Sequence, residues 1–393
     1  MAKLYLKKNE ERRLELGHQW IFSNEIERVE ELNKNGEVVD LYTYNYKYLG
    51  KGIYNKHSLI AYRHLTDFKE EIDKKFLYKR INNANAQRKK VNRDSNIYRM
   101  VNSESDYLPG LIIDRFDDRY SIQIFSVGME IFKNEIVEIL KENFKAKFVI
   151  EKNDNELRVL EGLSKEENIL LDYVDSEDKT FVLSIDEIKY KLDLQNGQKT
   201  GFYLDQAANR KLIREYVREG DDVLDLFCNE GGFALNAAYA KAQSVIAVDS
   251  SEHAIKMSNE NAKLNNFKNI EFICKDVFEF YNDIFQDSKR YDVIILDPPS
   301  FTKNKKNVIP ALKGYQELNY KAMRLLKPNG ILFTFSCSHH IDERNFEIMM
   351  MKAASMARKR IKILEMKNTS YDHPILPSMS ETKYLKSYVL NVS

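Results

Sequence analysis

The chain has few cysteines, almost no net charge and no long apolar run. Its 393 residues include three cysteines, one tryptophan and seven prolines. An odd number of cysteines without metal-ligand spacing argues against a disulfide framework and a zinc site, and is typical of a reducing cytosol. No apolar run approaches the roughly 18 residues of a membrane span, and the N-terminus is charged almost from its start. We therefore expect a soluble, cytoplasmic protein without a membrane or metal partner.

The charges balance over the whole chain but not locally. Lys+Arg 61 against Asp+Glu 60 gives a net charge of +1, which neither favours nor excludes a polyanionic partner. Between Lys74 and Arg99 the only acid is Asp94, and the apolar residues fall at approximately helical spacing. This segment is either a solvated helix face or a surface that contacts phosphates. Its candidate nucleic-acid contacts are Arg88, Lys89, Lys90 and Arg93.

Hydrophobic patterning divides the chain into three parts. Residues 1–72 contain short alternating segments broken by glycines, which predicts a small β-rich module. Residues 73–187 mix a helical pattern with strands and predict a small α+β domain. From 188 to 393 strands and helices alternate, which predicts a doubly wound α/β sheet with helices on both faces. Its strands are expected at Asp222–Phe227, Ser244–Val248, Ile270–Ile273, Tyr291–Leu296, Ile331–Ser336, Ile361–Met366 and Leu385–Val392.

Aromatic residues gather at two places in the first module. The segment Gly17–Phe22 holds the only tryptophan, and four tyrosines lie between Tyr42 and Tyr48. Aromatic rings near Lys and Arg can stack on nucleic-acid bases, but such rings are more often core or strand-surface residues. Both interpretations remain open from composition.

The segment Tyr291–Phe301, YDVIILDPPSF, places an acid where ligands bind. A charge-free run of β-formers predicts a strand buried on both faces, and Pro298 and Pro299 end it directly after Asp297. Ligands of open parallel sheets bind beyond the carboxyl ends of the strands. The alternative is an ordinary strand-ending turn.

Three other strands end in the same way. The first runs into Asn229-Glu230-Gly231-Gly232, where the glycines allow close backbone approach to a ligand and a helix begins at about Ala234. This spacing is not GxGxxG, which disfavours a nicotinamide dinucleotide. Asp249 ends the next strand, where an acid can bind ribose hydroxyls, and Asp276 follows the third. One such acid could be a helix cap, but acids after four successive strands indicate a binding site.

This set resembles the class I S-adenosylmethionine-dependent methyltransferases. The segment Asn196–Gln206, NGQKTGFYLDQ, is similar to the motif that opens the catalytic domain of the RlmI-like ribosomal RNA cytosine-C5 methyltransferases. The resemblance extends over almost the whole chain. Further segments that carry it are Gly17–Asn24, Ser103–Arg115, Asp297–Phe301, Phe335–Ser338 and Asp372–Pro374. It implies an N-terminal PUA domain, a central α+β domain and a Rossmann-like methyltransferase domain.

The resemblance also implies roles for individual residues. The resemblance implies S-adenosylmethionine as the cofactor and ribosomal RNA of the large subunit as the substrate. The family has an arginine at the position of Ala207, so whether Arg210, three residues on, substitutes for it is open. The implied cofactor residues are Lys199, Thr200, Tyr203, Asp205, Asp225, Phe227, Gly231, Asp249, Ser250, Asp276, Val277 and Asp297.

Cys337 is the implied nucleophile. A cysteine after a β-run is commonly a small core residue, but Ser336–His340 follows the fifth strand, beside the edge where Asp297 lies. C5 of cytosine is a poor nucleophile, and thiolate addition at C6 activates it. Asp297 is expected to bind the N3/N4 edge of the base. Cys228 and Cys274 are expected to be structural.

Other assignments stay open. His339, His340 and His373 receive no role, and the base that removes the C5 proton is not identified. An N-methyltransferase acting on guanine is one alternative, since it needs no cysteine. A catalytically inactive RNA-binding assembly factor is another, and a homodimer is possible.

Overall fold

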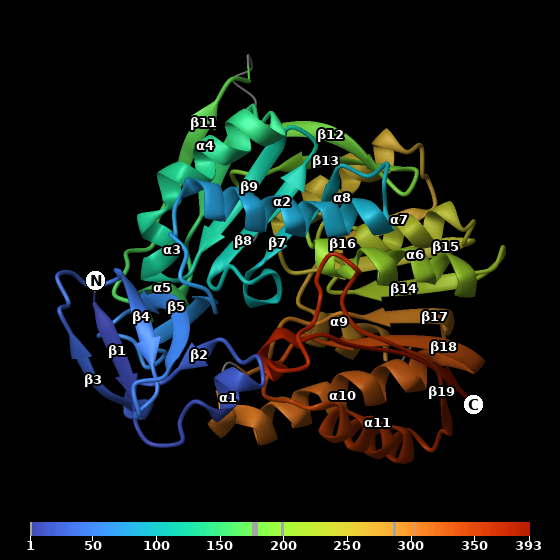
Figure 1. Ribbon diagram of the computed structural model, residues 1–393. Coiled ribbons are helices and arrows are strands. Elements are labelled where there is room, and N and C mark those ends of the chain that lie inside the picture. The colour runs from blue at the N-terminus through green and yellow to red at the C-terminus, as the bar shows by residue number, and fades with distance from the viewer. Residues whose placement is uncertain (1, 175–179, 198–199, 286–287, 303) are drawn as a thin grey trace. The chain divides into compact units, whose positions relative to one another are not determined.

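The computed structural model describes residues 2–174, 180–197, 200–285, 288–302 and 304–393 (Figure 1). The chain forms two compact units, each built from three segments. Unit 1 comprises Met1–Thr180, Leu192–Asp205 and Tyr371–Thr382. Unit 2 comprises Phe181–Lys191, Gln206–Ser370 and Lys383–Ser393. Within the described ranges, none of the helices combines the length and apolar character that a bilayer crossing requires.

The described part of unit 1 contains two sheets. The first has the order β2-β6-β5-β4-β1-β3 and the second the order β11-β10-β9-β8-β7. The strands of the first are β1 (Lys3–Leu6), β2 (Trp20–Ile21), β3 (Ile26–Glu30), β4 (Val38–Tyr42), β5 (Tyr48–Tyr54) and β6 (Tyr62–Thr66). Those of the second are β7 (Ile97–Asn102), β8 (Leu111–Phe116), β9 (Arg119–Ile124), β10 (Phe148–Lys152) and β11 (Glu167–Asp172).

One core joins the two sheets of unit 1. Ile53 and Leu65 of the first sheet are buried in the same apolar cluster as strands β7 to β10. Gly128 lies against Ile53, and a Cβ at this glycine would come within 2.3 Å of that side chain. The expected boundary between residues 72 and 73 therefore separates two sheets but lies inside one compact unit. The helices here are α1 (Arg12–Glu15), α2 (Lys74–Val91), α3 (Val127–Ile131), α4 (Lys133–Phe144) and α5 (Glu156–Leu160).

Helix α2 packs on the second sheet through the apolar positions that the sequence predicts. Asp73 caps its first turn by accepting the backbone N–H of Phe76 at 2.8 Å. Leu77 and Ile81 are fully buried, since residues four apart lie on the same helix face. The helix ends at Val91, and the chain then enters β7.

The segment Tyr371–Thr382 is part of unit 1 although its neighbours in sequence belong to unit 2. The backbone N–H of Arg99 donates to Asp372 Oδ2 at 2.8 Å, and Arg88 donates to the Asp372 carbonyl oxygen at 3.0 Å. Asp372 Oδ1 lies 2.9 Å from Nδ1 of His373. Burial opposes the charge of Asp372, but His373 and Arg99 hold the pKa of this carboxyl below its ordinary value. Buried polar contacts thus fix this segment within unit 1.

Unit 2 is built on the doubly wound sheet that the sequence predicts. In the described residues the strand order is β16-β15-β14-β17-β18-β20-β19, with β20 antiparallel to its neighbours. The strands are β14 (Asp222–Leu226), β15 (Ser244–Asp249), β16 (Ile270–Cys274), β17 (Tyr291–Leu296), β18 (Leu326–Ser336), β19 (Ile361–Lys367) and β20 (Lys386–Val392). The order reverses between β14 and β17, the point where such sheets bind ligands.

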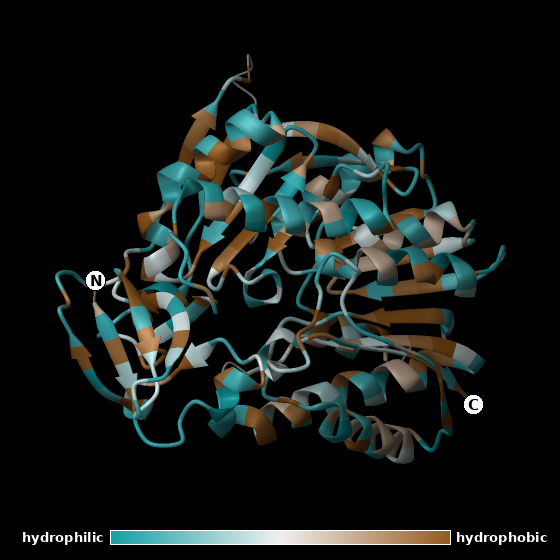
Figure 2. Ribbon diagram, in the orientation of Figure 1, coloured by the Kyte–Doolittle hydropathy of each residue, from teal (hydrophilic) through white to brown (hydrophobic). Residues whose placement is uncertain are grey.

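Helices cover both faces of this sheet (Figure 1). One apolar cluster contains residues of α6 (Ala207–Tyr216), α7 (Gly232–Tyr239) and α8 (Glu252–Leu264). The other contains residues of α9 (Val277–Ile284), α10 (Val308–Leu325) and α11 (Glu343–Ala357). Strand β17 lies between them, is buried along almost its whole length and is mostly brown in Figure 2. The predicted α/β class is therefore confirmed.

A hairpin precedes this sheet in sequence. Its strands are β12 (Thr180–Ile185) and β13 (Ile188–Asp193), and both turn residues, Asp186 and Glu187, have positive φ. The expected boundary between residues 187 and 188 falls directly after this turn. The chain changes units within β13, after Lys191.

Candidate active site

The loop after β14 has the conformation of a ligand-binding turn. Phe227, Asn229 and Gly231 all have positive φ, at 66°, 47° and 80°. A Cβ on Gly231 would lie 3.2 Å from the ring of Phe272 and 3.3 Å from Ser258. The loop therefore needs glycine at this position both for its backbone conformation and for space.

Asp225 lies at the base of this loop and is fully buried. Its Oδ2 accepts the backbone N–H of Ala234 at 2.9 Å, near the start of α7. Burial raises the pKa of this carboxyl well above its ordinary value, and the neighbouring carboxylates of Asp297 and Asp249 raise it further. Oδ1 has no hydrogen-bond partner among the described residues. A buried carboxyl oxygen without a partner is suited to accept from a ligand.

Asp249 and Asp276 end the next two strands, as predicted. Asp249 Oδ2 accepts the N–H of Asn229 at 2.9 Å, and its Oδ1 accepts the N–H of Ser251 at 2.9 Å. This carboxylate thereby connects the loop after β14 to the loop after β15. Asp276 is exposed and caps α9 by accepting the N–H groups of Phe278 and Glu279. Asp276 is therefore the N-cap of α9, the alternative role that the sequence allowed for one of these acids.

Two predicted neighbours lie beside these acids. Ser250, next to Asp249, is exposed, and Val277, next to Asp276, is buried as the first residue of α9. Val277 belongs to the apolar cluster under the sheet, so its side chain supports the edge of the site.

Asp297 is held by a chain of buried amides that the sequence reasoning missed. Its Oδ2 accepts Nε2 of Gln206 at 3.0 Å, and Oε1 of Gln206 accepts Nδ2 of Asn209 at 2.6 Å. Asn209 Oδ1 accepts the hydroxyl of Ser387 from β20 at 3.2 Å. Gln206 and Asn209 are three residues apart, so they share one face of α6. The sequence offered only the spacing of the two amide residues as a signal, and it does not indicate their partners.

Cys337 follows β18 and is half-buried. Strands β17 and β18 are parallel neighbours, with Leu296 opposite Thr334, so Asp297 and Cys337 follow the same edge of the sheet. The pKa of Tyr315 is raised to about 12, mainly by burial, and the neighbouring Cys337 and Asp297 contribute to this rise. The structure therefore brings these two predicted catalytic residues to one place, around the phenol of Tyr315.

A hydroxyl network joins the two loops that carry Asp297 and Cys337. The Ser338 hydroxyl lies 3.1 Å from the Ser300 hydroxyl and 3.0 Å from the Tyr315 phenol. Ser338 is fully buried, whereas Ser300 is exposed. Tyr315 lies on α10, far from both loops in sequence, and nothing in the local pattern around it indicated this contact.

Arg210 packs on the glycine loop. It is 6% exposed, and a Cβ on Gly232 would come within 2.7 Å of its Cδ. The guanidinium-bearing side chain thus fills the space that Gly232 leaves open at the start of α7. Arg210 therefore lies next to the predicted cofactor loop.

The other predicted cofactor residues belong to unit 1. Thr200 and Asp205 are buried and Tyr203 is half-buried. The preceding turn is organised by Asp193, whose Oδ1 accepts the N–H groups of Gln195 and Asn196 at 3.0 Å and 2.9 Å. Lys199 lies outside the described residues.

The prediction that Arg88 contacts nucleic acid is wrong. Arg88 is 2% exposed and forms a two-pronged ion pair with Asp106, with N–O distances of 2.5 Å and 2.6 Å. Lys89 is also bonded within the unit, to the carbonyl oxygens of Arg93 and Ser95 and to Asn96 Oδ1. These contacts close the C-terminal end of α2.

The exposed part of the basic segment is smaller than the sequence suggested. Lys90 and Arg93 remain exposed, as do Lys75 and Lys79. Trp20 is half-buried, its Nε1 donates to Glu104 at 2.9 Å, and the guanidinium of Arg63 lies 5.7 Å from its ring centroid.

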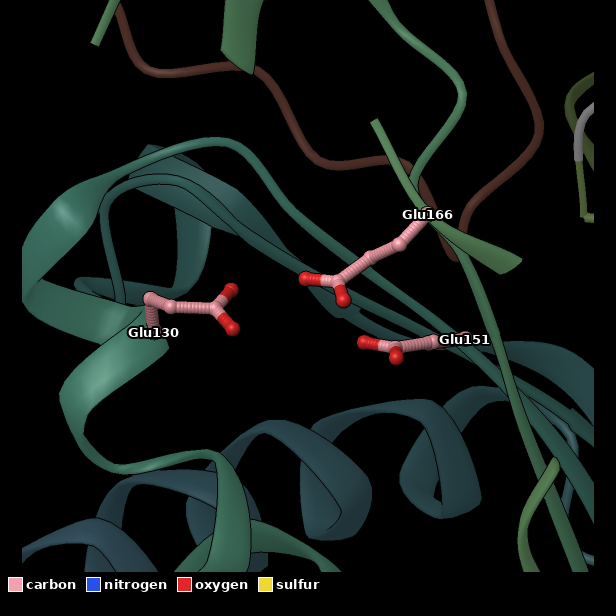
Figure 3. Close-up of side chains that lie close together, drawn as sticks. All are labelled: Glu130, Glu151 and Glu166. Atoms are coloured by element: carbon pink, nitrogen blue, oxygen red, sulfur yellow. The ribbon is translucent and has the colours of Figure 1, made fainter. Parts of the chain in front are cut away.

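Three glutamates lie close together in unit 1 (Figure 3). Oxygens of Glu130, Glu151 and Glu166 lie within 4.8 Å of one another, a spacing that a metal ion could bridge. Lys133 lies 2.5 Å, 3.0 Å and 3.4 Å from their carboxylates, in that order. Arg158, which is fully buried, pairs with Glu130 and Glu166 at 2.8 Å. Two cations thus occupy the centre of the cluster, and we assign it as an ion-pair network.

Sequence comparison places the chain among known proteins. A family model of a PUA-like domain matches residues 4–67, and a methyltransferase domain model matches residues 218–384. Over 397 residues the chain is 36% identical to the ribosomal RNA large subunit methyltransferase I of Vibrio campbellii, covering 100% of this chain and 99% of that protein. The chain belongs to the methyltransferase I family. The member from Aeromonas hydrophila is also 36% identical over 397 residues, with 99% of each chain covered.

Solved structures agree with the fold of the methyltransferase I family. A Streptococcus mutans protein assigned as a SAM-dependent methyltransferase has a TM-score of 0.83 at 22% identity, covering 100% of both chains. A methyltransferase structure in complex with SAH has a TM-score of 0.85 at 23% identity, again covering 100% of both chains. At these identities the likeness concerns the fold. The expected PUA-like domain and class I methyltransferase fold are confirmed.

The cofactor of the methyltransferase I family is S-adenosylmethionine, and the residues present fit it. The cofactor carries a positively charged sulfonium and ammonium, and Asp225 offers a buried carboxyl oxygen without a partner among the described residues. Asp249 lies where an acid can accept ribose hydroxyls. The positive φ of Gly231 gives the loop the close backbone approach that a bound nucleoside needs.

Proposed function

We propose that this chain transfers a methyl group from S-adenosylmethionine to C5 of a cytosine in large-subunit ribosomal RNA. The observation that carries the proposal is the half-buried thiol of Cys337 at the sheet edge where Asp297 lies. A methyltransferase that acts on a nitrogen or oxygen nucleophile has no need for a thiol there, whereas C5 methylation does.

The chemistry assigns a role to each residue. The Cys337 thiolate adds to C6 of cytosine, and the electron pair of the C5–C6 double bond becomes available at C5. Bound S-adenosylmethionine would supply the methyl group to C5, its S–CH3 bond breaking as S-adenosylhomocysteine leaves. A base then removes the C5 proton, the C5–C6 double bond re-forms and the thiolate leaves. Asp297, held by Gln206, would bind the N3/N4 edge of the base and stabilise the adduct.

The substrate class rests on the relatives and on the surface of unit 1. The relatives are named as methyltransferases of large-subunit ribosomal RNA, and the chain carries a PUA-like domain. The exposed cations Lys90 and Arg93 are candidate phosphate contacts. A base cannot react at C5 and C6 within a stacked duplex, so we expect single-stranded or opened RNA.

Covalent trapping tests the function directly. RNA transcribed with 5-fluorocytosine has no C5 proton to remove, so the adduct with Cys337 should persist after methyl transfer. We expect a complex that survives denaturing electrophoresis with the wild type and with Cys228→Ala, and none with Cys337→Ala. Methylation that is retained in Cys337→Ala, with no trapped complex for the wild type, would favour a guanine N-methyltransferase. Cofactor binding without methylation of any ribosomal RNA would favour an assembly factor.

A further inference from the structure

Lys386 is a buried lysine that lies beside the end of β18, the strand that Cys337 follows. It is the first residue of β20, lies opposite Ser336 of β18 and is only 6% exposed. The antiparallel pairing therefore brings its side chain to the loop that Cys337 occupies. Lysine is almost never buried without an anionic partner, because removing its charge from water is costly.

The ammonium of Lys386 is bonded only to neutral groups. Nζ donates to the carbonyl oxygens of Ser338 and Tyr384, both at 2.8 Å. Among the described residues, Lys386 forms no ion pair with a carboxylate. An ammonium has three N–H donors, so one remains for a further acceptor. Ser338 is the residue directly after Cys337, and the donor therefore lies beside the thiol.

Four titratable side chains act on Lys386, and three of them are engaged elsewhere. Glu343 pairs with Lys383 at 2.7 Å, and Asp342 caps α11 by accepting the N–H of Asn345 at 2.7 Å. Burial lowers the pKa of Lys386 to about 8, and of the groups that raise it Cys337 contributes most. Cys337 is therefore the group that most favours the charged form of Lys386.

We propose that Lys386 is a positioning residue that takes the Cys337 proton and holds the sulfur as a thiolate. In the unprotonated form of Lys386 the two N–H groups of Nζ donate to the two carbonyl oxygens, and its lone pair accepts the proton. The S–H bond breaks, a third N–H bond forms at Nζ, and the electron pair stays on sulfur, ready to attack C6. When the sulfur leaves C6 at the end of the reaction, the same ion pair re-forms. The inference rests on the proposed function for its purpose, but the ion pair itself needs neither RNA nor cofactor.

Alkylation of the thiol with iodoacetamide measures the thiolate directly. The chain carries Cys228→Ala and Cys274→Ser, so that Cys337 is the only thiol, and the rate is followed from pH 5 to 10. We expect a half-point below about 8.5, the value of an ordinary thiol. Lys386→Gln keeps hydrogen-bond donors but loses the charge, and should slow alkylation at pH 7 about tenfold. Lys386→Arg keeps the charge and should stay within about threefold of the parent rate.

Lys352→Gln is the matched control, since it removes an exposed lysine of α11 that is not among the groups acting on Lys386, and it should leave the rate unchanged. A parent half-point at or above 8.5 overturns the inference without any Lys386 variant. Equal pH profiles for the parent and a folded Lys386→Gln variant overturn it as well. If the pH profiles of alkylation shift as expected while no adduct forms on 5-fluorocytosine RNA, the ion pair is supported and the proposed function is contradicted.

Discussion

Two cysteines follow strands at the same edge of the seven-stranded sheet, yet their surroundings differ. Cys228 follows β14 and is 3% exposed. Burial raises the pKa of its thiol well above the ordinary value, and Asp225 and Asp249 raise it further. Cys337 follows β18, is half-buried, and has the cation of Lys386 among its neighbours. One loop keeps its thiol protonated and inert, whereas the other presents a thiol beside a positive charge.

The difference shows that position at a sheet edge does not by itself make a cysteine reactive. Carboxylates surround the cofactor loop because the ligand is cationic, and the same carboxylates oppose a thiolate there. The loop after β18 differs in having the ammonium of Lys386, from β20, beside its thiol. In the proposed function, the cofactor and the nucleophile would thus be held by two loops with different electrostatic surroundings.

Replacing Cys337 or Cys228 separately should give the largest difference in methylation rate. Cys337→Ala should reduce methylation by at least about 10³-fold, since it removes the nucleophile, while leaving the dissociation constant of S-adenosylmethionine unchanged. Cys228→Ala should cost about 1 kcal/mol of unfolding free energy and leave the methylation rate within a few-fold of the wild type. Methylation assays and calorimetric titration of the cofactor measure both. Equal losses of activity in the two variants would contradict the division between the loops.

The basic segment offers a similar contrast, between the buried Arg88 and the exposed Arg93. Arg88→Met leaves Asp106 as a buried, unpaired charge and should lower the unfolding free energy by about 3–5 kcal/mol. Arg93→Met removes an exposed arginine and should change it by less than about 0.5 kcal/mol. Urea unfolding of both variants is the measurement. A destabilisation of similar size in both would show that Asp106 does not depend on Arg88.

The buried carboxyl of Asp225 should make stability depend on pH. Its pKa in the folded chain is raised, so its contribution to stability is fully present below the unfolded pKa and is lost as the pH rises toward the folded pKa. Asp225→Asn removes this loss, so its unfolding free energy relative to the wild type should increase from pH 4 to pH 7. Asp225→Ala deprives the Ala234 N–H of its acceptor and should cost about 1 kcal/mol more than Asn. A pH-independent difference between Asn and wild type would contradict the raised pKa.

The smallest effect concerns RNA binding. Lys90→Gln with Arg93→Gln should weaken binding modestly and reduce the slope of log K against log salt by about 2, one for each lost phosphate contact. Lys141→Gln with Lys145→Gln, at the C-terminal end of α4 in unit 1, provides a control of equal charge. Filter binding at several salt concentrations distinguishes the pairs. An unchanged slope in the α2 variant would remove this helix from the RNA-binding surface.

The strands and the acids that follow them could be predicted because local pattern determines them. β17 was placed at Tyr291–Leu296 without error, since its apolar run and prolines define both ends. β18 begins at Leu326, earlier than the expected Ile331, and continues through Pro328 and Gly330. The partners of site residues could not be predicted. Gln206 reaches Asp297 across 91 positions of sequence, and Lys386 reaches Ser338 across 48.

The same limit explains the wrong assignment of Arg88. The number of charges along α2 does not show that the Arg88 guanidinium is buried against the carboxylate of Asp106, 18 residues later in the sequence. Such pairings depend on which elements the fold brings together, and only the three-dimensional structure contains that information.

The placement of Tyr371–Thr382 in unit 1 has a consequence for synthesis on the ribosome. Residues 1–180 leave the ribosome first, but Asp372, which accepts hydrogen bonds from Arg88 and Arg99, is made almost 200 residues later. Unit 1 therefore cannot complete its buried contacts while its first segment alone is exposed. The N-terminal half must wait, partly assembled, until most of unit 2 has been translated, so the two units reach their final structures together rather than in order along the chain.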